Sequence, residues 1–221
     1  MRNSVLKCLF LLAVFALGLN LPAYAAKEIS ANTDSGANVE HFVLEKPHTQ
    51  IVFIASHLGF SNSYGRFMDF DGEFILDHDD LSKSSVNVVI DAASLDMGHE
   101  KWTAHLKNKD FLDVEKFPEI RFVSDAVEWS GEKEAKVSGV LSMHGVDRRV
   151  TLDVQHNKSG VHPFSGKYIA GFSAETTIRR SDFGMTFGLP LLSDKVSIKI
   201  SVEGIRSGED TSDYDVENGK D

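Results

Sequence analysis

HLKNKDFLDVEKFPEIRF, residues 105–122, changes from a helical pattern to a strand pattern within a few residues. Good helix formers come first, and Pro118 ends any helix that continues this far. After the proline, Ile120 and Phe122 recur at a two-residue period, which predicts a strand with at least one buried face. The stretch therefore predicts a small helical insert at about residues 99–113, lying as a cover over the open end of a closed sheet.

Alternating apolar residues on both sides of this stretch predict about eight strands in all. The expected strands lie at residues 51–58, 67–74, 86–91, 120–127, 137–143, 150–154, 172–180 and 196–202. Short connections join several of them as hairpins, so we expect antiparallel pairing, with a loop at residues 157–166. Gly72 interrupts one strand and predicts a bulge or a tight bend there.

The aromatic composition bears on what fills the centre of such a fold. Phenylalanine is the commonest aromatic residue, with 15 copies against 4 tyrosines and 2 tryptophans. Rings without hydroxyl groups suit an interior that makes few hydrogen bonds. A closed antiparallel barrel of about eight strands either fills with its own side chains or encloses one small ligand. The pattern predicts an all-β protein and leaves both kinds of interior open.

The two ends of the chain differ in composition from its middle. Residues 1–25 have basic residues before an apolar run and finish in Ala-Tyr-Ala, which predicts a signal peptide cleaved after Ala25. Residues 26–38 are polar and predict a flexible leader, whereas residues 207–221 are acidic and predict a disordered tail. The folded domain is therefore expected at residues 39–206 of an exported protein.

Cysteine usage and charge exclude several classes of function. Cys8 is the only cysteine and lies within the predicted signal peptide, so disulfides, thiolate metal sites and a cysteine nucleophile are not expected. Without Arg2 and Lys7 the 23 basic residues fall to 21, against 33 acidic ones, for a net charge near −12. This charge argues against nucleic acid and anionic lipid surfaces as partners. No motif predicts a metal site or a cofactor.

Seven stretches cover nearly all of the expected domain. They begin at His48, Tyr64, Ser84, His105, Val137, Gly171 and Leu192, and read HTQIVFIASHLGFS, YGRFMDFDGEF, SSVNVVIDAASLDMG, HLKNKDFLDVEKFPEIRF, VSGVLSMHGVDRRVTLDV, GFSAETTIRRSDFGM and LSDKVSIKISVEG. In this order they resemble the YceI-like family of bacterial polyisoprenoid-binding proteins, and KFPEIRF and RSDFG are the most specific matches. The resemblance implies a periplasmic, lipocalin-like barrel whose lumen holds a long isoprenoid or a similar apolar lipid, such as a prenyl quinone. It implies no established reaction, so we expect a carrier and not an enzyme.

The strand faces and the resemblance together name the residues expected to line this lumen. They are Phe53, His57, Phe67, Phe74, Val88, Ile90, Leu106, Phe111, Ile120, Phe122, Leu141, Phe172, Ile178 and Arg180. His57 and Arg180 each end an apolar strand face, so either could meet a polar head group at the mouth. The alternative for both is a structural hydrogen bond, or an ion pair with a carboxylate such as Asp182.

Other functions stay open at this stage. A hydrolase or isomerase could use the same lumen with His57 as its base, although the sequence shows no activated nucleophile and no paired carboxylates. A barrel filled by its own side chains could instead be an interaction module. A membrane redox or isoprenoid enzyme as cargo donor or acceptor, and a homodimer, are further partners that the sequence leaves open.

Overall fold

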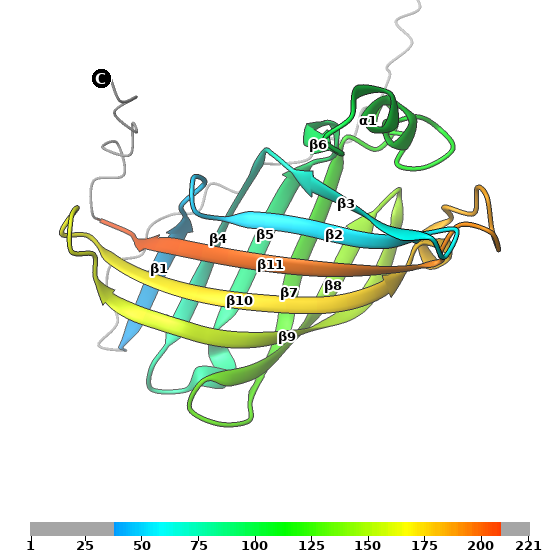
Figure 1. Ribbon diagram of the computed structural model, residues 1–221. Helices are drawn as coiled ribbons and strands as arrows, with labels where there is room; N and C mark the ends of the chain where they lie inside the picture. The colour runs from blue at the N-terminus through cyan, green and yellow to red at the C-terminus, as the bar shows by residue number, and fades with distance from the viewer. Residues whose placement is uncertain (1–37, 209–221) are drawn as a thin grey trace, which may run out of the picture. The chain divides into compact units, whose positions relative to one another are not determined.

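The alternating strands join into one closed antiparallel ring (Figure 1). The structure is a computed structural model and describes residues 38–208. Eight strands form the ring in the order β1–β4–β5–β7–β8–β9–β10–β11, and β11 pairs back with β1. They are β1 (Val39–Leu44), β4 (Phe70–Asp77), β5 (Ser85–Asp91), β7 (Glu119–Trp129), β8 (Glu134–Met143), β9 (Val146–Val161), β10 (Tyr168–Arg179) and β11 (Lys195–Arg206). The expected antiparallel barrel of about eight strands is confirmed.

The remaining three strands, β2, β3 and β6, add a further row of pairing to β11 at one end of the ring. β2 (Gln50–His57) pairs with the first half of β11, whereas β1 pairs with its last residues. β3 (Ser61–Phe67) pairs with β2, and β6 (Leu95–Asp96) pairs with β3. Within the described sheet β6 has no second neighbour, so the wall is open between β6 and β7 at this end.

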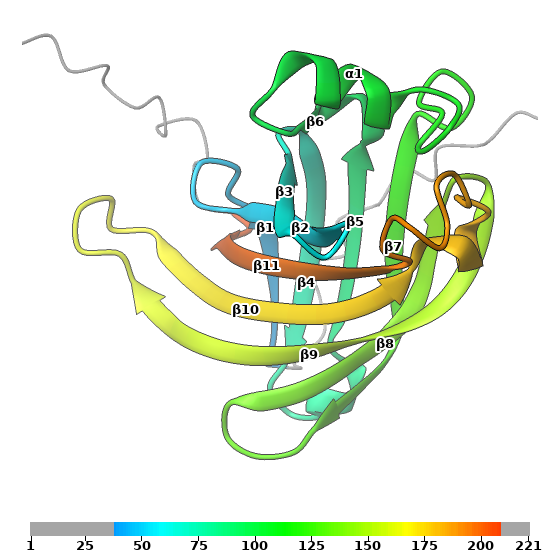
Figure 2. The same cartoon turned by 45° about the vertical axis from the view of Figure 1, so that its right-hand side comes forward.

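The helical insert lies at this open end. It contains α1 (Glu100–Lys107), and residues 97–118 connect β6 to β7. Figures 1 and 2 both place α1 beside β6, at one end of the ring. Within residues 38–208 no helix is both long enough and apolar enough to cross a membrane. The insert thus occupies the position that the sequence predicted for it, and its helix is shorter than the insert as a whole.

Three details of the sequence interpretation are wrong. The expected strand at residues 67–74 is interrupted, because β3 ends at Phe67 and β4 begins at Phe70. Residues 157–161 belong to β9 and pair with β10, as in the partners Val161 and Tyr168. Gly72 causes no register shift in the pairing of β4 with β5. A side chain on Gly72 would lie 2.7 Å from the Asn87 carbonyl oxygen, so the glycine permits a close approach of the two strands.

A bulge does occur in the neighbouring wall. The pairing of β7 with β8 shifts between Ser124 and Ala126, opposite Gly139. A Cβ on Gly139 would lie 2.2 Å from the Val123 carbonyl oxygen, so only glycine fits against this bulge. The extra residue changes which side chains of β7 face inward, and Val127 therefore points inward along with Phe122.

Phenylalanine rings pack the end of the barrel opposite the insert. Phe42 stacks on Phe74 at a centroid distance of 4.8 Å, and Phe74 meets Phe172 edge to face at 5.4 Å. Phe42 is fully buried where β1 pairs with β11. The rings therefore close one end of the ring, while the insert borders the other.

The predictions for the two ends of the chain fall almost entirely outside the described residues. The signal peptide, the leader and the acidic tail share only Asn38, Ser207 and Gly208 with the described range. Those assignments stay predictions.

Candidate functional site

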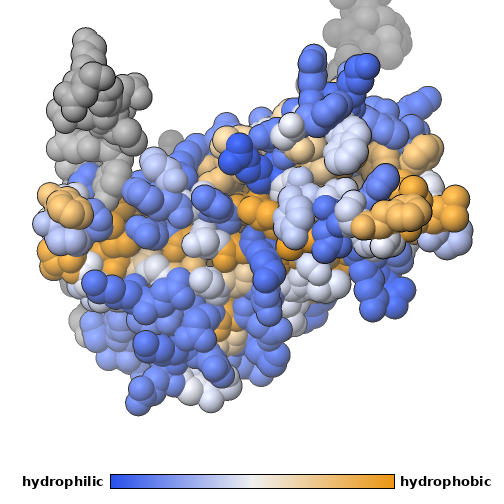
Figure 3. Space-filling model, viewed as in Figure 1, coloured by the Kyte–Doolittle hydropathy of each residue, from blue (hydrophilic) through white to orange (hydrophobic). Residues whose placement is uncertain are grey.

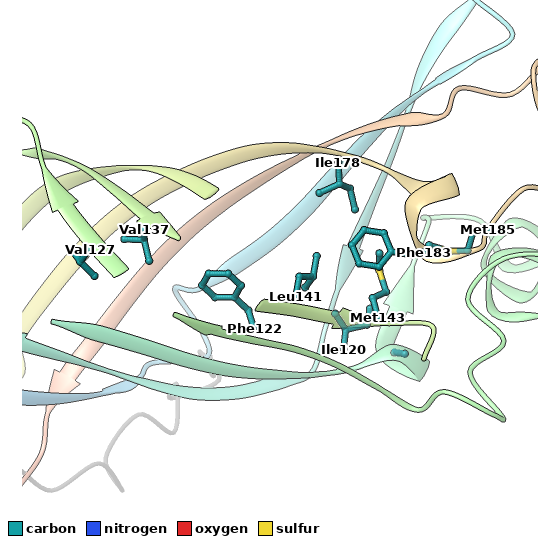
Figure 4. Packing of buried hydrophobic residues seen from close by; sticks show 10 residues of the cluster. Ile120, Phe122, Val127, Val137, Leu141, Met143, Ile178, Phe183 and Met185 are labelled. Carbon is teal, nitrogen blue, oxygen red and sulfur yellow. The ribbon is translucent and has the colours of Figure 1, made fainter. Parts of the chain in front are cut away.

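The ring encloses a cavity of about 500 Å³ whose wall is almost entirely apolar. Each strand of the ring presents alternate side chains to it, as the two-residue period of a strand requires. Figure 4 shows this for one part of the wall, where Phe122 and Leu141 from neighbouring strands and Ile178 from β10 point into the same space. The barrel therefore has an open lumen, and the alternative of a core filled by its own side chains does not describe it.

Every residue that the sequence analysis placed at the ligand site lies on the wall of this cavity. These residues are Phe53, His57, Phe67, Phe74, Val88, Ile90, Leu106, Phe111, Ile120, Phe122, Leu141, Phe172, Ile178 and Arg180. They come from seven strands, from the insert and from the segment after β10, and the fold brings them together. Their role in ligand binding stays a prediction.

Sequence reasoning missed other parts of the wall. Met97 and Trp102 reach the cavity from the insert, and Met185 and Leu192 reach it from the connection between β10 and β11, residues 184–194. The connection has no strand period, so periodicity could not identify it. The only signal was its apolar composition, GMTFGLPLL, which is unusual for an exposed connection.

The ionisable side chains on the wall gather where the insert and residues 184–194 border the cavity, an end that we call the mouth, whereas Thr49, Ser84 and Ser85 line it elsewhere. His57, His105 and Arg180 lie here. Among the described residues that form the wall there is no aspartate, glutamate or lysine, so Arg180 is its one permanent charge. The wall at the mouth therefore offers hydrogen-bond donors and positive charge to a bound molecule, whereas the carboxylate of Asp110 lies outside it, 3.7 Å from Nε2 of His105.

Arg180 joins the barrel wall to the connection beside it. Its side chain is buried, with the residue only 6% exposed, and it donates three hydrogen bonds to backbone carbonyls. The acceptors are Ser193 and Met185, each at 2.8 Å, and Leu192 at 3.4 Å. Burial lowers the pKa of Arg180 from its ordinary value, and the nearby Asp194 carboxylate partly opposes this. Arg180 is thus held by carbonyls, in line with the structural alternative, and its partner is not the carboxylate of Asp182.

Asp194 anchors the other end of the same connection. Its carboxylate accepts hydrogen bonds from the backbone N–H and the hydroxyl of Ser181, each at 2.9 Å. The hydrogen bond from the Ser181 backbone lowers the pKa of Asp194, and the hydroxyl and two arginines act in the same direction against the effect of burial. Residues 184–194 are therefore fixed at both ends beside the mouth.

Aromatic rings join this connection to the insert across the mouth. Phe111 meets Phe187 at a centroid distance of 5.4 Å, and His105 meets the two rings at 5.1 and 5.6 Å. The guanidinium of Arg180 lies 5.8 Å from the centre of the Phe111 ring. The insert and residues 184–194 thus contact each other over the entrance to the cavity.

His57 lies at the exposed end of β2. Its ring lies 6.1 Å from that of Trp102. Among the described residues, no carboxylate or other group makes a hydrogen bond to the imidazole that would orient it. Residues 38–208 also hold no cluster of three or more metal-ligating side chains.

Comparison with known proteins adds a sequence relationship to this geometry. The family description that matches the chain is the YceI-like domain, over residues 42–204. A UPF0312 protein of Pseudomonas putida strain GB-1 is 42% identical over 162 residues, which cover 73% of this chain and 83% of the relative.

Solved structures have the same fold. The crystal structure of BcnA from Burkholderia cenocepacia matches with a TM-score of 0.66 at 23% identity, covering 72% of this chain and 98% of that one. A polyisoprenoid binding domain from Saccharophagus degradans matches with a TM-score of 0.57 at 15% identity, covering 75% and 98%. At these identities the two structures support the barrel fold itself.

Proposed function

Because the chain belongs to the YceI-like domain family, we propose that it binds a polyisoprenoid or a similar long apolar lipid, such as a prenyl quinone, in the lumen of the barrel. The observation that carries the proposal is the cavity of about 500 Å³, apolar along its length and bordered by donors at one end. The polyisoprenoid binding domain of Saccharophagus degradans, which has the same fold, supports this class of ligand.

The energetics of such a lumen favour a hydrocarbon chain. Each buried CH₂ contributes roughly 0.8 kcal/mol, so two to three isoprene units would gain on the order of 8–12 kcal/mol before ordering costs are subtracted. A micromolar complex needs about 8 kcal/mol. Contacts of this kind have no direction, and we therefore expect selectivity to depend on the width and length of the lumen more than on chemical detail.

The polar groups of the mouth suggest how the lipid is oriented. Arg180, His57 and His105 border this end of the cavity; no described wall residue is a carboxylate, and the one carboxylate paired with this set, Asp110 beside His105, lies outside the wall. A head group with hydrogen-bond acceptors, such as the carbonyls of a quinone, is favoured here over an amine or a quaternary ammonium group. The chain of the lipid would then extend from the mouth toward Phe74 and Phe172.

We further propose that the protein acts as a carrier in the periplasm and exchanges its cargo with a membrane redox or isoprenoid enzyme. Residues 1–25 support export because they have the three regions of a signal peptide. Expression in a Gram-negative host, followed by fractionation and N-terminal sequencing, should give periplasmic protein that begins at Ala26. A chain that keeps residue 1 and stays in the cytoplasm would contradict this compartment.

Lipid uptake can be tested with two neighbouring substitutions on β7. Phe122 lines the cavity, whereas the next side chain, Val123, is exposed on the outer face. Phe122→Arg should lower the affinity for a prenyl quinone at least tenfold, because an unpaired charge in an apolar lumen is costly. Val123→Arg should bind as the wild type does. Titration with the quinone, and mass spectrometry of lipid extracted by organic solvent, are the measurements.

Two results would count against binding in the lumen. One is uptake by Phe122→Arg at the wild-type level, and the other is repeated failure of the wild type to release or take up any long lipid. Chemical turnover of bound lipid that disappears in His57→Ala, while binding persists, would instead favour an enzyme that uses the same lumen.

A further inference from the structure

Several large apolar side chains around the mouth are exposed to solvent, and of these only Trp102 also lines the lumen. We call Leu58, Phe60, Trp102, Phe187 and Leu191 the mouth patch. Phe60 is 88% exposed and Leu191 is 75% exposed, and neither lines the cavity. Phe60 and Leu191 therefore contribute nothing to the barrel core, and packing within the described chain does not explain why large apolar residues stand at these positions.

The mouth patch comes from three separate segments that the fold brings to the same end. The pairing of Ala55 with Val196 places the turn between β2 and β3 beside residues 184–194. Trp102 on α1 lies against His57, and Phe187 lies against Phe111. Figure 3 shows apolar surface at the end of the molecule where Figure 1 draws these connections, and another apolar area at the opposite end. The patch thus surrounds the entrance through which a ligand must pass.

The turn between β2 and β3 places Leu58 in a left-handed backbone conformation, which is unfavourable for leucine. Leu58 and Gly59 have φ values of 54° and 78°, and the Phe60 N–H donates to the His57 carbonyl at 3.0 Å. Both central positions of such a turn favour Gly, Asn or Asp, so leucine is a poor choice for local structure. A second turn of this kind has His144 at the same position, and its ring bonds to the Phe183 carbonyl at 2.9 Å. Leu58 is half exposed to solvent, which points to a contact outside the chain.

The charge of the mouth differs from that of the whole chain. The chain has a formal net charge of −10. Residues 57–64 and 184–192 contain no Asp, Glu, Lys or Arg, and residues 99–118 contain four lysines and four acidic residues. The segments that carry the mouth patch therefore have no net charge, which suits a partner surface that is apolar and electrically neutral.

We propose that the mouth patch inserts into the surface of a bilayer of zwitterionic or uncharged lipids. Aromatic and leucine side chains at loop tips are the groups that partition into the interface of a bilayer. Docking in this orientation would let a lipid pass between bilayer and lumen without crossing water. The passage of cargo rests on the proposed function, but docking is a property of the apolar side chains alone and can be measured without cargo.

The experiment is vesicle flotation with a matched control at the other end of the barrel. The described barrel begins at Asn38, so a chain beginning at Ala26 retains it. Phe60→Ser and Leu191→Ser should each lower the partition coefficient on phosphatidylcholine vesicles about tenfold. Phe164 lies in the connection between β9 and β10 and is 93% exposed, so Phe164→Ser removes an equally exposed ring and should stay within twofold of the wild type. Phosphatidylglycerol vesicles should bind the wild type no better than phosphatidylcholine does.

Three outcomes would overturn the proposal. The first is no binding of the wild type to either kind of vesicle. The second is a loss of vesicle binding in Phe164→Ser as large as that in Phe60→Ser. The third is concentration-dependent dimerisation without vesicles that Phe60→Ser abolishes, while its binding to vesicles stays unchanged. Prenyl quinone added from ethanol should be taken up normally by Phe60→Ser and Leu191→Ser. This arm separates failure of docking from failure of the lumen, because uptake from ethanol needs no bilayer.

Discussion

Arg180 shows how a single side chain positions the mouth. A buried guanidinium needs acceptors for its hydrogen bonds, and here the backbone of residues 184–194 supplies them instead of a carboxylate. Arg180, directly after β10, therefore determines where residues 184–194 lie, and Phe187 in that segment contacts Phe111 of the insert. The same cation remains on the wall of the lumen, where a head group would meet it.

Replacing this side chain tests its structural role at the residue scale. Arg180→Lys keeps the charge but cannot reach three carbonyls in a fixed planar arrangement, so some of them lose their donor. We expect the free energy of unfolding to fall by about 2–4 kcal/mol. Arg179→Lys is the control, because the Arg179 side chain is exposed and its ion pair with the Asp194 carboxylate is long, at 3.7 Å between Nη1 and Oδ2. This exchange should change the free energy of unfolding by less than about 1 kcal/mol. Urea unfolding of both variants gives the comparison, and equal stability would show that the three bonds contribute little.

At the scale of elements, the barrel depends on how β11 serves two neighbours on one edge. β2 pairs with its first half and β1 with its end, so the ring closes with two short strands in place of one long strand. Gly204 lies where β1 pairs, and a Cβ there would be 2.4 Å from the Phe74 ring and 2.9 Å from Cβ of Phe42. The absence of a side chain thus lets the phenyl rings cover the junction.

Gly204→Ala should weaken this closure by about 1–3 kcal/mol, because the rings that it would contact are buried and cannot move away freely. Gly171 on β10 provides the control, since the nearest atoms to a Cβ there are 3.7 Å away. Gly171→Ala should leave the free energy of unfolding within about 1 kcal/mol of the wild type. Thermal unfolding measures both, and a larger loss in Gly171→Ala would contradict this explanation of the closure.

The whole molecule combines a solid end and an open end in one ring. Phenylalanine rings fill the end where β1 meets β11, and the contacts between the insert and residues 184–194 cover the other. The apolar side chains that face the cavity between these ends have no atoms packed against them on that side, as they would in a filled core. They gain van der Waals contacts when a ligand enters. Cargo and folding should therefore be linked.

This linkage gives a prediction for the intact protein. Removal of lipid by solvent extraction and refolding should lower the melting temperature, and addition of a prenyl quinone should restore it. A free ligand concentration of 100 times Kd corresponds to a stabilisation of about 2.7 kcal/mol. Phe122→Arg should show no such rise. Differential scanning calorimetry of the wild type with and without quinone is the measurement, and a melting temperature independent of ligand would contradict binding to the folded state.

Much of the lumen could be predicted from the sequence because a strand has a strict two-residue period. Once Ile120 and Phe122 are placed on one face, no other arrangement of that segment keeps the apolar face away from water. The same reasoning places Phe172 and Ile178 on the inner face of β10. Sequence alone thus determined the all-β class and the inward face of these segments, but not the bulge after Ser124 that turns Val127 inward.

Only the tertiary structure decided the rest. Residues 157–161 lack an apolar period and still form a strand, because β10 supplies their hydrogen-bond partners. β1 (Val39–Leu44) was missed since its partners near Arg206 are far away in the sequence. Whether the centre is open, and where residues 184–194 lie against the insert, depends on distances between segments that no local pattern encodes. Periodicity reports the direction of a side chain, whereas a cavity depends on how far apart the opposing walls are held.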